Sequence, residues 1–475
     1  MLAGCSESGP PVGQVGYITS YYGGAAAEEP HATLAARDVL SAGGTAADAV
    51  VAMYFTLAVT LPSAAGLGGG GVCVYYDAKR NKAETLDFIA RAPGRPAPAG
   101  RWPAAVPGTV RGMFALQARY GRLRWERLIQ PAESLARFGI PTPRALVSVI
   151  PGSSVLSDPL SAREFGGASG KGLTEADALR RIDLAGTLGR IRAAGAGDLY
   201  TGALARAYVD GIASIGGSVA MDDLRGYHPV WRETVVGSFG SHKVHLPPSP
   251  VTGGRIAAAI WAKLSDNGAF AGMEPGARER VLVDTARDAY AGAWARPEAG
   301  GGSAGFLAMD REGSAAACTV TMNRPFGTGK TIPGLGFLAV QPPDDPATAL
   351  LGLVPMVIAN HNNNQAFMAA TGAGDGLAPV ALVDAALHAT ENKMPVDRAV
   401  ATARAAPGPT QGATVVELAA PPSVKAAFTG AGVSSTPSIG RVLMMYCAGG
   451  MVVDPGSCAV TSDPRGFGYA INAER

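Results

Sequence analysis

The apolar and polar residues of this chain repeat with two periods, one typical of helices and one typical of strands. Apolar residues between positions 31 and 42 fall on one helical face and are followed by Gly43-Gly44, which predicts a helix that ends there. A second helix is predicted from Thr45, a residue that favours the N-cap position, to Thr60. The same pattern predicts further helices over residues 120–135, 203–215, 255–264 and 278–295.

Runs of strand-like composition lie between these helices and become more frequent in the last third of the chain. The predicted strands are residues 72–76, 85–88, 306–309, 315–321 and 336–340. Long helices combined with successive hairpin-like strands predict an α+β protein built in layers. The glycine-rich stretch 299–302 is the clearest breakpoint between a helix-rich and a strand-rich part.

Composition and charge exclude several classes of protein. Of the 475 residues, 47% are hydrophobic and 16% are charged, which provides enough apolar side chains for a buried core and excludes a disordered chain. The net charge is +2 and no basic run is present, so nucleic acid is not an expected partner. The five cysteines form no C-x-x-C pair, so no metal site is expected. Cys447 and Cys458 are either bridged, if the protein is exported, or two free thiols.

The first residues resemble part of a signal that directs a protein to the cell envelope. Leu2-Ala3-Gly4-Cys5 has the spacing of a bacterial lipoprotein signal, in which the cysteine thiol becomes lipidated, but the charged and apolar regions that precede such a cysteine are missing. One interpretation is the end of a signal, which would attach the protein to a membrane through Cys5. The other is a chance tetrapeptide. The longest apolar stretch, residues 46–61, contains Asp48 and is too short to span a bilayer.

Ser303 follows a run of glycines and precedes a predicted strand, and three interpretations of this serine are open. The first is a flexible loop without a role. The second is a nucleophile elbow, because residues 301–305 match G-x-S-x-G, although an elbow needs a strand before the serine and a helix after it. The third is a serine that attacks the carbonyl group of Gly302, forms an ester and becomes a new chain end. Its position at the start of a strand favours the third interpretation.

Three further places in the sequence could assist such a nucleophile. Thr321 is either an ordinary strand threonine or a hydrogen-bond partner of Ser303 across a hairpin. Residues 372–376, rich in glycine, either form a tight turn or offer backbone N–H groups to an oxyanion. Asp344-Asp345 is either a solvated pair in a loop or an anchor for an amine.

Short motifs with a consistent order and spacing run through the chain. In the first part they are Ala46-Ala47-Asp48-Ala49, the glycine run 68–71, Asp87-Phe88, Val106-Pro107-Gly108-Thr109 and Pro247-Pro248-Ser249-Pro250. In the second part they are Phe326-Gly327-Thr328-Gly329 and Ser462-Asp463-Pro464-Arg465-Gly466. With these motifs the chain resembles the gamma-glutamyltransferases (gamma-glutamyltranspeptidases), which are N-terminal nucleophile hydrolases. The resemblance extends from about His31 to the C-terminus.

The resemblance implies a four-layer αββα sandwich and a chain that cuts itself before Ser303. Residues 1–30 would then be a tether, residues 31–302 the large-subunit part and residues 303–475 the small-subunit part of one intertwined domain. The reaction implied is hydrolysis or transfer of gamma-glutamyl or related acyl compounds, without a cofactor or a metal. The residues implied in catalysis are Ser303, Thr321 and Gly376, and those implied in substrate binding are Asn323, Asp345 and Arg91.

Departures from the family pattern affect the expected substrate pocket. Ile89 stands where the family has the arginine that holds the substrate α-carboxylate, and Arg91 is the nearby cation. A serine replaces the threonine nucleophile, and residues 351–355 lack the hydroxyl groups of the family pocket. Asp375-Gly376 replaces a pair of oxyanion glycines. An apolar lining favours less charged acyl groups, so poor hydrolysis of glutathione is expected.

Two hypotheses of different classes follow. The first is a divergent, self-processing amide hydrolase or acyl transferase with Ser303 as its nucleophile. The second is a catalytically degenerate, uncleaved relative that binds a protein partner or has a structural role at the cell envelope. Both place the protein in the periplasm or cell envelope. Only the first requires cleavage of the Gly302–Ser303 bond.

Overall fold

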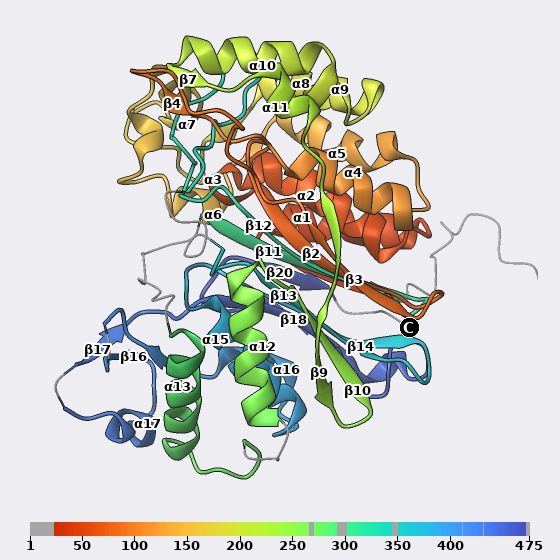
Figure 1. The fold of residues 1–475 in the computed structure, drawn as a ribbon, viewed down its shortest axis with the longest axis vertical. Helices are drawn as coiled ribbons and strands as arrows, with labels where there is room; N and C mark the ends of the chain where they lie inside the picture. The colour runs from red at the N-terminus through yellow and green to blue at the C-terminus, as the bar shows by residue number, and fades with distance from the viewer. Residues whose placement is uncertain are drawn as a thin grey trace, which may run out of the picture.

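Two stacked antiparallel β-sheets form the centre of the protein, and helices cover the outer face of each (Figure 1). This computed structural model describes residues 23–265, 270–291, 302–343, 350–410, 412–430 and 432–471. The strands of the first sheet are β1 Gly23–Ala27, β2 Gly70–Asp77, β3 Lys82–Asp87, β8 Val230–Glu233, β11 Ser303–Asp310, β12 Ala315–Thr321 and β20 Tyr469–Ile471. Their order in the sheet is β20-β1-β11-β12-β2-β3-β8, which places β11 and β12 near its centre.

The second sheet contributes the other half of the central layers. Its strands are β9 Val235–Phe239, β10 His242–Leu246, β13 Val354–Asn360, β14 Gln365–Ala373, β18 Arg441–Cys447 and β19 Cys458–Thr461, in the order β19-β18-β14-β13-β10-β9. Small sheets lie at the periphery: β4 Trp102–Pro103 with β7 Gly217–Ser218, β5 Ile140–Pro141 with β6 Ala178–Leu179, and β15 Ala405–Pro407, β16 Thr414–Glu417 and β17 Val433–Thr436 together.

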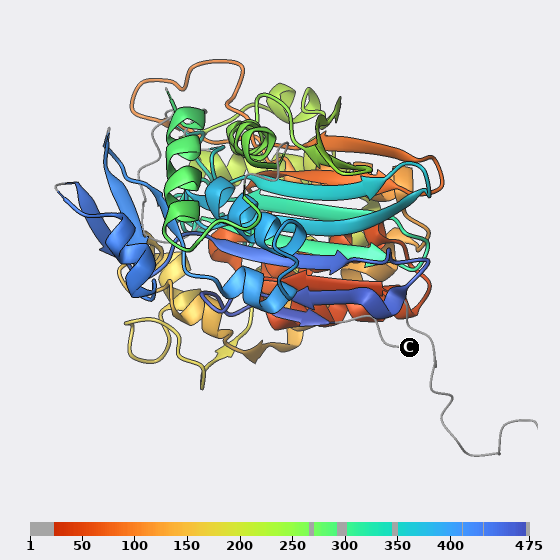
Figure 2. The same cartoon turned by 90° about the horizontal axis from the view of Figure 1, so that it is seen from below.

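The helices form the two outer layers. Those on the side of the first sheet are α1 Pro30–Ser41, α2 Ala46–Thr60, α3 Pro62–Ala65, α4 Thr109–Tyr120, α5 Trp125–Phe138, α6 Arg144–Val147, α7 Pro159–Phe165, α8 Ile182–Ala194, α9 Asp198–Thr201, α10 Ala203–Ser214 and α11 Met221–Arg225. Those on the side of the second sheet are α12 Thr252–Ser265, α13 Ala277–Ala289, α15 Ala378–Thr390, α16 Val396–Ala401 and α17 Pro422–Ala427. The view from below shows helices of the second group in front of the strands (Figure 2).

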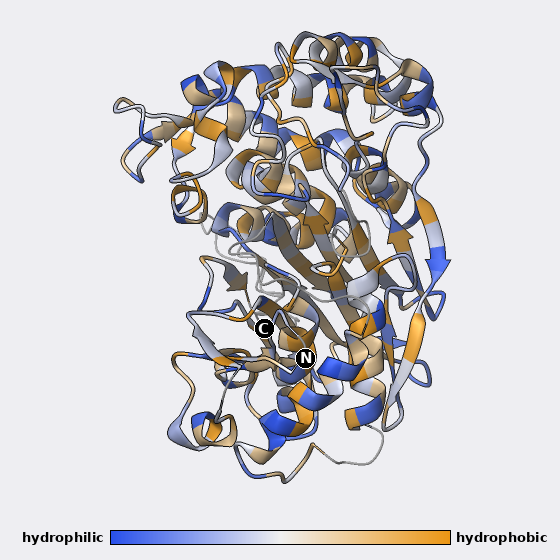
Figure 3. Ribbon diagram, turned by 60° about the vertical axis from the view of Figure 1, so that its left-hand side comes forward, coloured by the Kyte–Doolittle hydropathy of each residue, from blue (hydrophilic) through white to orange (hydrophobic). Residues whose placement is uncertain are grey.

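Three apolar cores hold the layers together. The largest joins the first sheet to α1, α2, α4, α5 and α8, and a second joins the other sheet to α12, α13, α15 and α16. A third lies between the sheets and includes Val74, Leu307 and Val357. Every residue of α2 is buried, as expected for a helix that is apolar on all sides. The hydropathy colouring shows the apolar strands at the centre (Figure 3). The predicted α+β, four-layer αββα sandwich is therefore confirmed.

The local predictions succeed where a single segment determines its own structure. Thr45 is the N-cap of α2, where its hydroxyl accepts a hydrogen bond from the backbone of Asp48 and the Asp48 carboxylate bonds back to Thr45. The predicted strand 315–321 has the observed bounds of β12. Among the described residues, no helix is both long enough and apolar enough to cross a membrane.

Three segment predictions need correction. The helix predicted over residues 278–295 ends at Ala289. Residues 120–135 are not one helix, because α4 ends at Tyr120 and α5 begins at Trp125. Residues 336–340 are not a strand, since only an isolated bridge joins Thr331 to Leu338. This segment is extended, and its alternate side chains enter two different apolar cores, with Phe337 in one and Leu338 in the other. The alternating pattern therefore reflects burial on two faces without a continuous ladder.

Two disulfide bonds connect neighbouring strands. Cys447 and Cys458 are bridged between β18 and β19, which resolves the alternative left open by the sequence. Cys73 and Cys318 are bridged between β2 and β12, directly opposite one another in the ladder and fully buried. The second bond links positions 245 residues apart and joins the parts of the chain before and after Ser303.

Candidate active site

Ser303 is the first residue of β11, a central strand of the first sheet. It lies directly opposite Thr321 in the ladder with β12, and only 5% of its surface is exposed. The strand that follows Ser303 removes the nucleophile-elbow interpretation, because an elbow requires a helix after the serine. The geometry is instead that of a residue at the start of a central strand, as an N-terminal nucleophile requires.

A backbone N–H group contacts the hydroxyl oxygen of Ser303. Gly374, directly after β14 in the second sheet, donates from its backbone nitrogen to Ser303 Oγ at 3.0 Å. The φ angle of Gly374 is +121°, a conformation that residues with side chains rarely adopt. Glycine at this position therefore allows the turn to direct an N–H group at the nucleophile. An N–H fixed in this way can stabilise an oxyanion that develops beside Ser303.

The carbonyl oxygen of Gly302 receives two hydrogen bonds. The Thr321 hydroxyl donates to it at 2.8 Å, and the backbone N–H of Met322 donates to it at 2.7 Å. Asn323 donates its own backbone N–H to Thr321 Oγ1 at 2.9 Å, which leaves the Thr321 proton free to point at Gly302. Two donors on one carbonyl oxygen are an arrangement that can stabilise negative charge on that oxygen.

The close approach of other backbone explains why residue 302 is glycine. A Cβ atom at Gly302 would lie 2.7 Å from the carbonyl carbon of Arg324, closer than such atoms pack. Substitution there would displace the peptide group that the two donors hold. The close packing around residue 302 thus requires a glycine before Ser303. The absence of a side chain there also leaves the Gly302 carbonyl group accessible to attack.

Asp375 and Gly376 continue the turn after Gly374. The backbone N–H of Leu377 donates to Asp375 Oδ1 at 2.8 Å, and burial raises the pKa of the Asp375 carboxyl group. Tyr290 donates its hydroxyl hydrogen to the carbonyl oxygen of Gly376 at 2.7 Å. The N–H group observed on Ser303 Oγ is that of Gly374, so a role for the Gly376 N–H in the oxyanion hole stays a prediction.

An apolar cluster lies next to the nucleophile. Its buried members are Val72, Val251, Leu350 and Leu353, with Ile89 packed against them. A Cβ atom at Gly352 would lie 3.6 Å from Ser303 Oγ, so the loop that carries Leu350 and Leu353 passes directly by the nucleophile. Leu351 belongs to the helix-side core instead. These contacts are apolar, and the prediction that they line the substrate pocket stays a prediction.

The predicted substrate-binding residues differ in where they lie relative to Ser303. Asn323 lies beside the site, with its backbone on Thr321 and its side-chain Nδ2 donating to the carbonyl oxygen of Gln341 at 2.9 Å. Arg91 is exposed, and its guanidinium lies over the ring of Tyr227 at 5.3 Å from the ring centre. Asp345 lies outside the described residues, as does Cys5. The binding roles of these residues stay predictions.

Sequence reasoning missed several groups that contact the site. Gly374 lies within the glycine-rich turn 372–376 that the sequence indicates. The sequence does not show which backbone N–H of this turn contacts Ser303 Oγ. Met322 contributes through its backbone, which leaves no signal in residue type. Arg441 reaches the carbonyl oxygen of Ser303 from β18, with Nη2 at 3.4 Å, although 138 residues separate them. No local pattern could reveal that contact.

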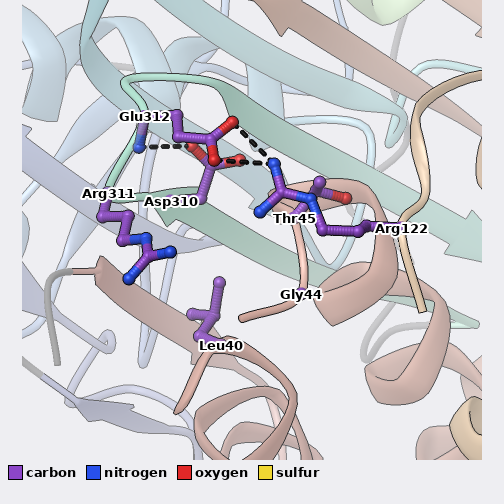
Figure 4. Close-up of a pocket in the computed structure, with 7 residues that line it drawn as sticks. All are labelled: Leu40, Gly44, Thr45, Arg122, Asp310, Arg311 and Glu312. Carbon is purple, nitrogen blue, oxygen red and sulfur yellow. Dashed lines mark hydrogen bonds and ion pairs between the residues drawn. The ribbon is translucent and has the colours of Figure 1, made fainter. Parts of the chain in front are cut away.

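The opposite end of β11 holds a small cavity of about 10 Å³, enough for roughly one water molecule (Figure 4). Arg122 forms an ion pair with Glu312 there at 2.6 Å, and Asp310 lies beside them. This cavity is separated from Ser303 by the length of β11 and does not belong to the candidate site. The described residues contain no group of three or more His, Cys, Asp or Glu side chains that could hold a metal ion.

Comparisons with known proteins identify the family of this chain. A sequence model described as gamma-glutamyltranspeptidase matches residues 32–296, a segment that ends before Ser303. The glutathione hydrolase proenzyme of Bacillus subtilis (strain 168) is 31% identical over 246 residues, 48% of this chain and 42% of that protein. The glutathione hydrolase proenzyme of Pseudomonas aeruginosa is 29% identical over 383 residues, 68% of each protein. The aligned parts span 41% to 47% of the length of several other curated relatives.

A solved structure shares the complete fold. The crystal structure of cephalosporin acylase from Bacillus halodurans superposes with a TM-score of 0.72 over 99% of both chains, at 18% sequence identity. This likeness covers the part of the chain that contains Ser303, which the family sequence model does not reach. The sequence model itself covers more than half of the 475 residues. By that match, this chain belongs to the gamma-glutamyltranspeptidase family.

Proposed function

We propose that this protein is a self-processing amide hydrolase or acyl transferase of the N-terminal nucleophile type, with Ser303 as its nucleophile. The observation that carries the proposal is the pair of donors on the carbonyl oxygen of Gly302, from Thr321 and Met322. A carbonyl oxygen held by two donors, directly before a serine at the start of a central strand, suits cleavage of that peptide bond.

Self-processing would proceed through an ester. Ser303 Oγ attacks the carbonyl carbon of Gly302, and the resulting oxyanion is held by Thr321 Oγ1 and the Met322 N–H. The C–N bond breaks, the serine proton passes to the leaving nitrogen, and Gly302 becomes esterified to Ser303. Water then hydrolyses the ester, which releases a carboxylate at Gly302 and a free α-amine at Ser303. The large part would be residues 1–302, and the small part residues 303–475.

Turnover would use the same serine and its new α-amine. The α-amine accepts the proton of Ser303 Oγ as this oxygen attacks the acyl carbon of the substrate amide, and then returns the proton to the leaving amine. The N–H of Gly374 lies 3.0 Å from the attacking oxygen, Ser303 Oγ, and this turn, with Gly376, would hold the oxyanion that forms on the neighbouring acyl carbon. Water or an acceptor amine releases the acyl group, which gives hydrolysis or transfer. Asp345 would bind a substrate ammonium group, and Asn323 would lie near the far end of the acyl chain.

The substrate we propose is an acyl amide less charged than a gamma-glutamyl compound. Ile89 packs with Val72 and Leu353 beside the nucleophile, where an apolar acyl group gains about 25 cal/mol for each Å² that it buries. Among its described residues, this apolar cluster offers no side-chain partner to a free α-carboxylate, whose desolvation there would be uncompensated. Loss of a charged hydrogen bond at this position weakens binding by roughly 2–5 kcal/mol.

The substrate class is tested with two matched anilides, one gamma-glutamyl and one whose acyl group keeps the α-amine but lacks the α-carboxylate. We expect kcat/KM to favour the compound without the carboxylate. Ile89→Arg should reverse that preference, whereas Ile89→Met, which changes shape without charge, should not. A strong preference of the natural protein for the gamma-glutamyl compound that is lost in Arg91→Ala would contradict the apolar pocket and assign the carboxylate to Arg91. No turnover of either compound by an intact chain would favour the degenerate relative instead.

The disulfide bonds support a location for the protein. Cys73–Cys318 and Cys447–Cys458 are bonds of a kind that persists in oxidising compartments and is rare in the cytosol. We therefore propose that the protein works in the periplasm or at the cell envelope. Attachment to a membrane through a lipid on Cys5 is a further part of this proposal and is tested by labelling with a radioactive fatty acid. A Cys5→Ser variant that keeps the label would contradict it.

A further inference from the structure

Arg441 places a cation between the nucleophile and the turn that follows β14. It is the first residue of β18 and lies opposite Ala373, the last residue of β14. Its Nη2 donates to the carbonyl oxygen of Ser303 at 3.4 Å. Its Nη1 lies 3.6 Å from where a Cβ atom of Gly374 would be. One guanidinium thus hydrogen-bonds Ser303 and lies beside the turn whose N–H faces Ser303 Oγ.

Glu28 holds this guanidinium in place. The Nε of Arg441 donates to Glu28 Oε2 at 2.6 Å, and 7% of the Glu28 side chain is exposed against 22% of the Arg441 side chain. Glu28 directly follows β1, the neighbour of β11, so the pair closes the site on that side. Gly466 leaves room for the arginine, because a Cβ atom there would lie 2.9 Å from Arg441 Cδ. The guanidinium is therefore held by two partners, the Glu28 carboxylate and the Ser303 carbonyl oxygen.

Three carboxylates lie near Arg441, and they differ in the ion pairs they form. Glu28 pairs with Arg441 directly, whereas Asp463 is already paired with Arg404 at 2.9 Å and with Arg465 at 3.0 Å. Asp375 has no such ion pair among the described contacts, and Arg441 opposes the rise in its pKa that burial causes. Arg441 is thus the cation that balances the charge of Asp375, which otherwise opposes an oxyanion held by the same turn.

We propose that Arg441, held by Glu28, is a positioning residue for Ser303 that also offsets the negative charge of Asp375 beside the oxyanion. This inference rests on the proposed function. By its contact with the Ser303 carbonyl it fixes the orientation of the residue whose α-amine becomes the base after cleavage. The Arg441 guanidinium, held at the carbonyl oxygen of Ser303, lowers the pKa of the Ser303 α-amine. A larger fraction of the α-amine is then unprotonated near neutral pH and can accept a proton.

The test compares Arg441→Met, which removes the charge and keeps the length, with Arg441→Lys, which keeps the charge without the planar fork. Each is assayed for cleavage at Gly302–Ser303 and for kcat and KM across pH. In Arg441→Met we expect kcat to fall about 10- to 100-fold with KM changed less than about threefold. We expect the acidic limb of the kcat profile to move up by about one pH unit, because the α-ammonium group loses a neighbouring cation. Arg441→Lys should keep the position of that limb and lose only part of kcat.

The control is Arg122→Met, which breaks an ion pair with Glu312. Glu312 lies just beyond the end of β11 that is opposite to Ser303. It should leave cleavage, kcat and the pH profile unchanged. Glu28→Gln, which loosens the anchor without removing the cation, should lower kcat less than Arg441→Met does. If Arg441→Met folds, cleaves and keeps the natural pH profile, Arg441 has no positioning role and the inference is wrong. If the natural chain itself stays uncleaved and inactive, the proposed function fails first, so the two failures are distinguishable.

Discussion

The hydroxyl group of Thr321 donates a hydrogen bond of 2.8 Å to the carbonyl oxygen of Gly302, the residue directly before the candidate nucleophile. Thr321 lies opposite Ser303 in the ladder between β11 and β12. Because Asn323 donates to the same hydroxyl oxygen, the Thr321 proton is directed at Gly302. The threonine therefore contacts the peptide bond at which we propose cleavage, in addition to lying opposite the serine.

Removing that hydroxyl should slow self-processing. We expect Thr321→Ala to reduce the rate of cleavage at Gly302–Ser303 about 10²-fold, the usual effect of deleting one oxyanion donor. Thr321→Ser keeps the donor and should remain within about tenfold of the natural rate. A time course of chain splitting on a reducing gel measures both. Equal rates for the alanine and serine variants would show that the hydroxyl has no part in cleavage.

Ser303 is expected to be required at both stages. Ser303→Ala lacks the oxygen that forms the ester with Gly302, so the chain should stay intact and no acyl amide should be turned over. Its unfolding temperature should remain close to that of the natural precursor, because the side chain is small. Turnover by this variant would remove Ser303 from the mechanism.

The charge of Asp375 predicts a dependence on pH. Burial raises the pKa of its carboxyl group, so the neutral form persists to a higher pH than usual and the charged form dominates only above that raised pKa. The charged form opposes the oxyanion, so Asp375→Asn should raise kcat relative to the natural protein at high pH. The ratio of the two kcat values should approach one as the pH falls through the raised pKa. A ratio that does not change with pH would mean that the charge of Asp375 does not reach the oxyanion.

The buried disulfide bond predicts how a cleaved protein behaves on a gel. Cys73 lies before Ser303 and Cys318 lies after it, so the bond between them joins the two parts covalently. A cleaved sample should therefore run as one band when denatured without reductant and as two bands when reduced. Cys73→Ser should give two bands in either condition. Two bands from the natural protein without reductant would show that this bond does not form.

Sequence patterns predicted the parts of this protein that depend on neighbouring residues. The helix from Thr45 to Thr60 and the strand from Ala315 to Thr321 are set by a capping residue and by local alternation. Helix α4 was missed because it starts after Gly108 without a capping side chain. The layered class came from the patterns, whereas the αββα arrangement came from the family resemblance.

The candidate site was only partly predictable for a physical reason. Ser303 and Thr321 are 18 positions apart on one hairpin, so the alternation of strand residues brings them together. Arg441 and Glu28 are 413 positions apart, and the bond from Cys73 to Cys318 spans 245. Such contacts arise from the order of strands across two sheets, which no local spacing encodes.

The most direct test of the self-processing claim is the intact mass of the purified natural protein after denaturation and reduction. The account predicts two species, one that ends at Gly302 and one that begins with Ser303 and carries a free α-amine. Ser303→Ala, prepared in parallel, should give one species of full mass. A natural chain that keeps its full mass after prolonged incubation at neutral pH, with its fold intact, would contradict self-processing at Gly302–Ser303.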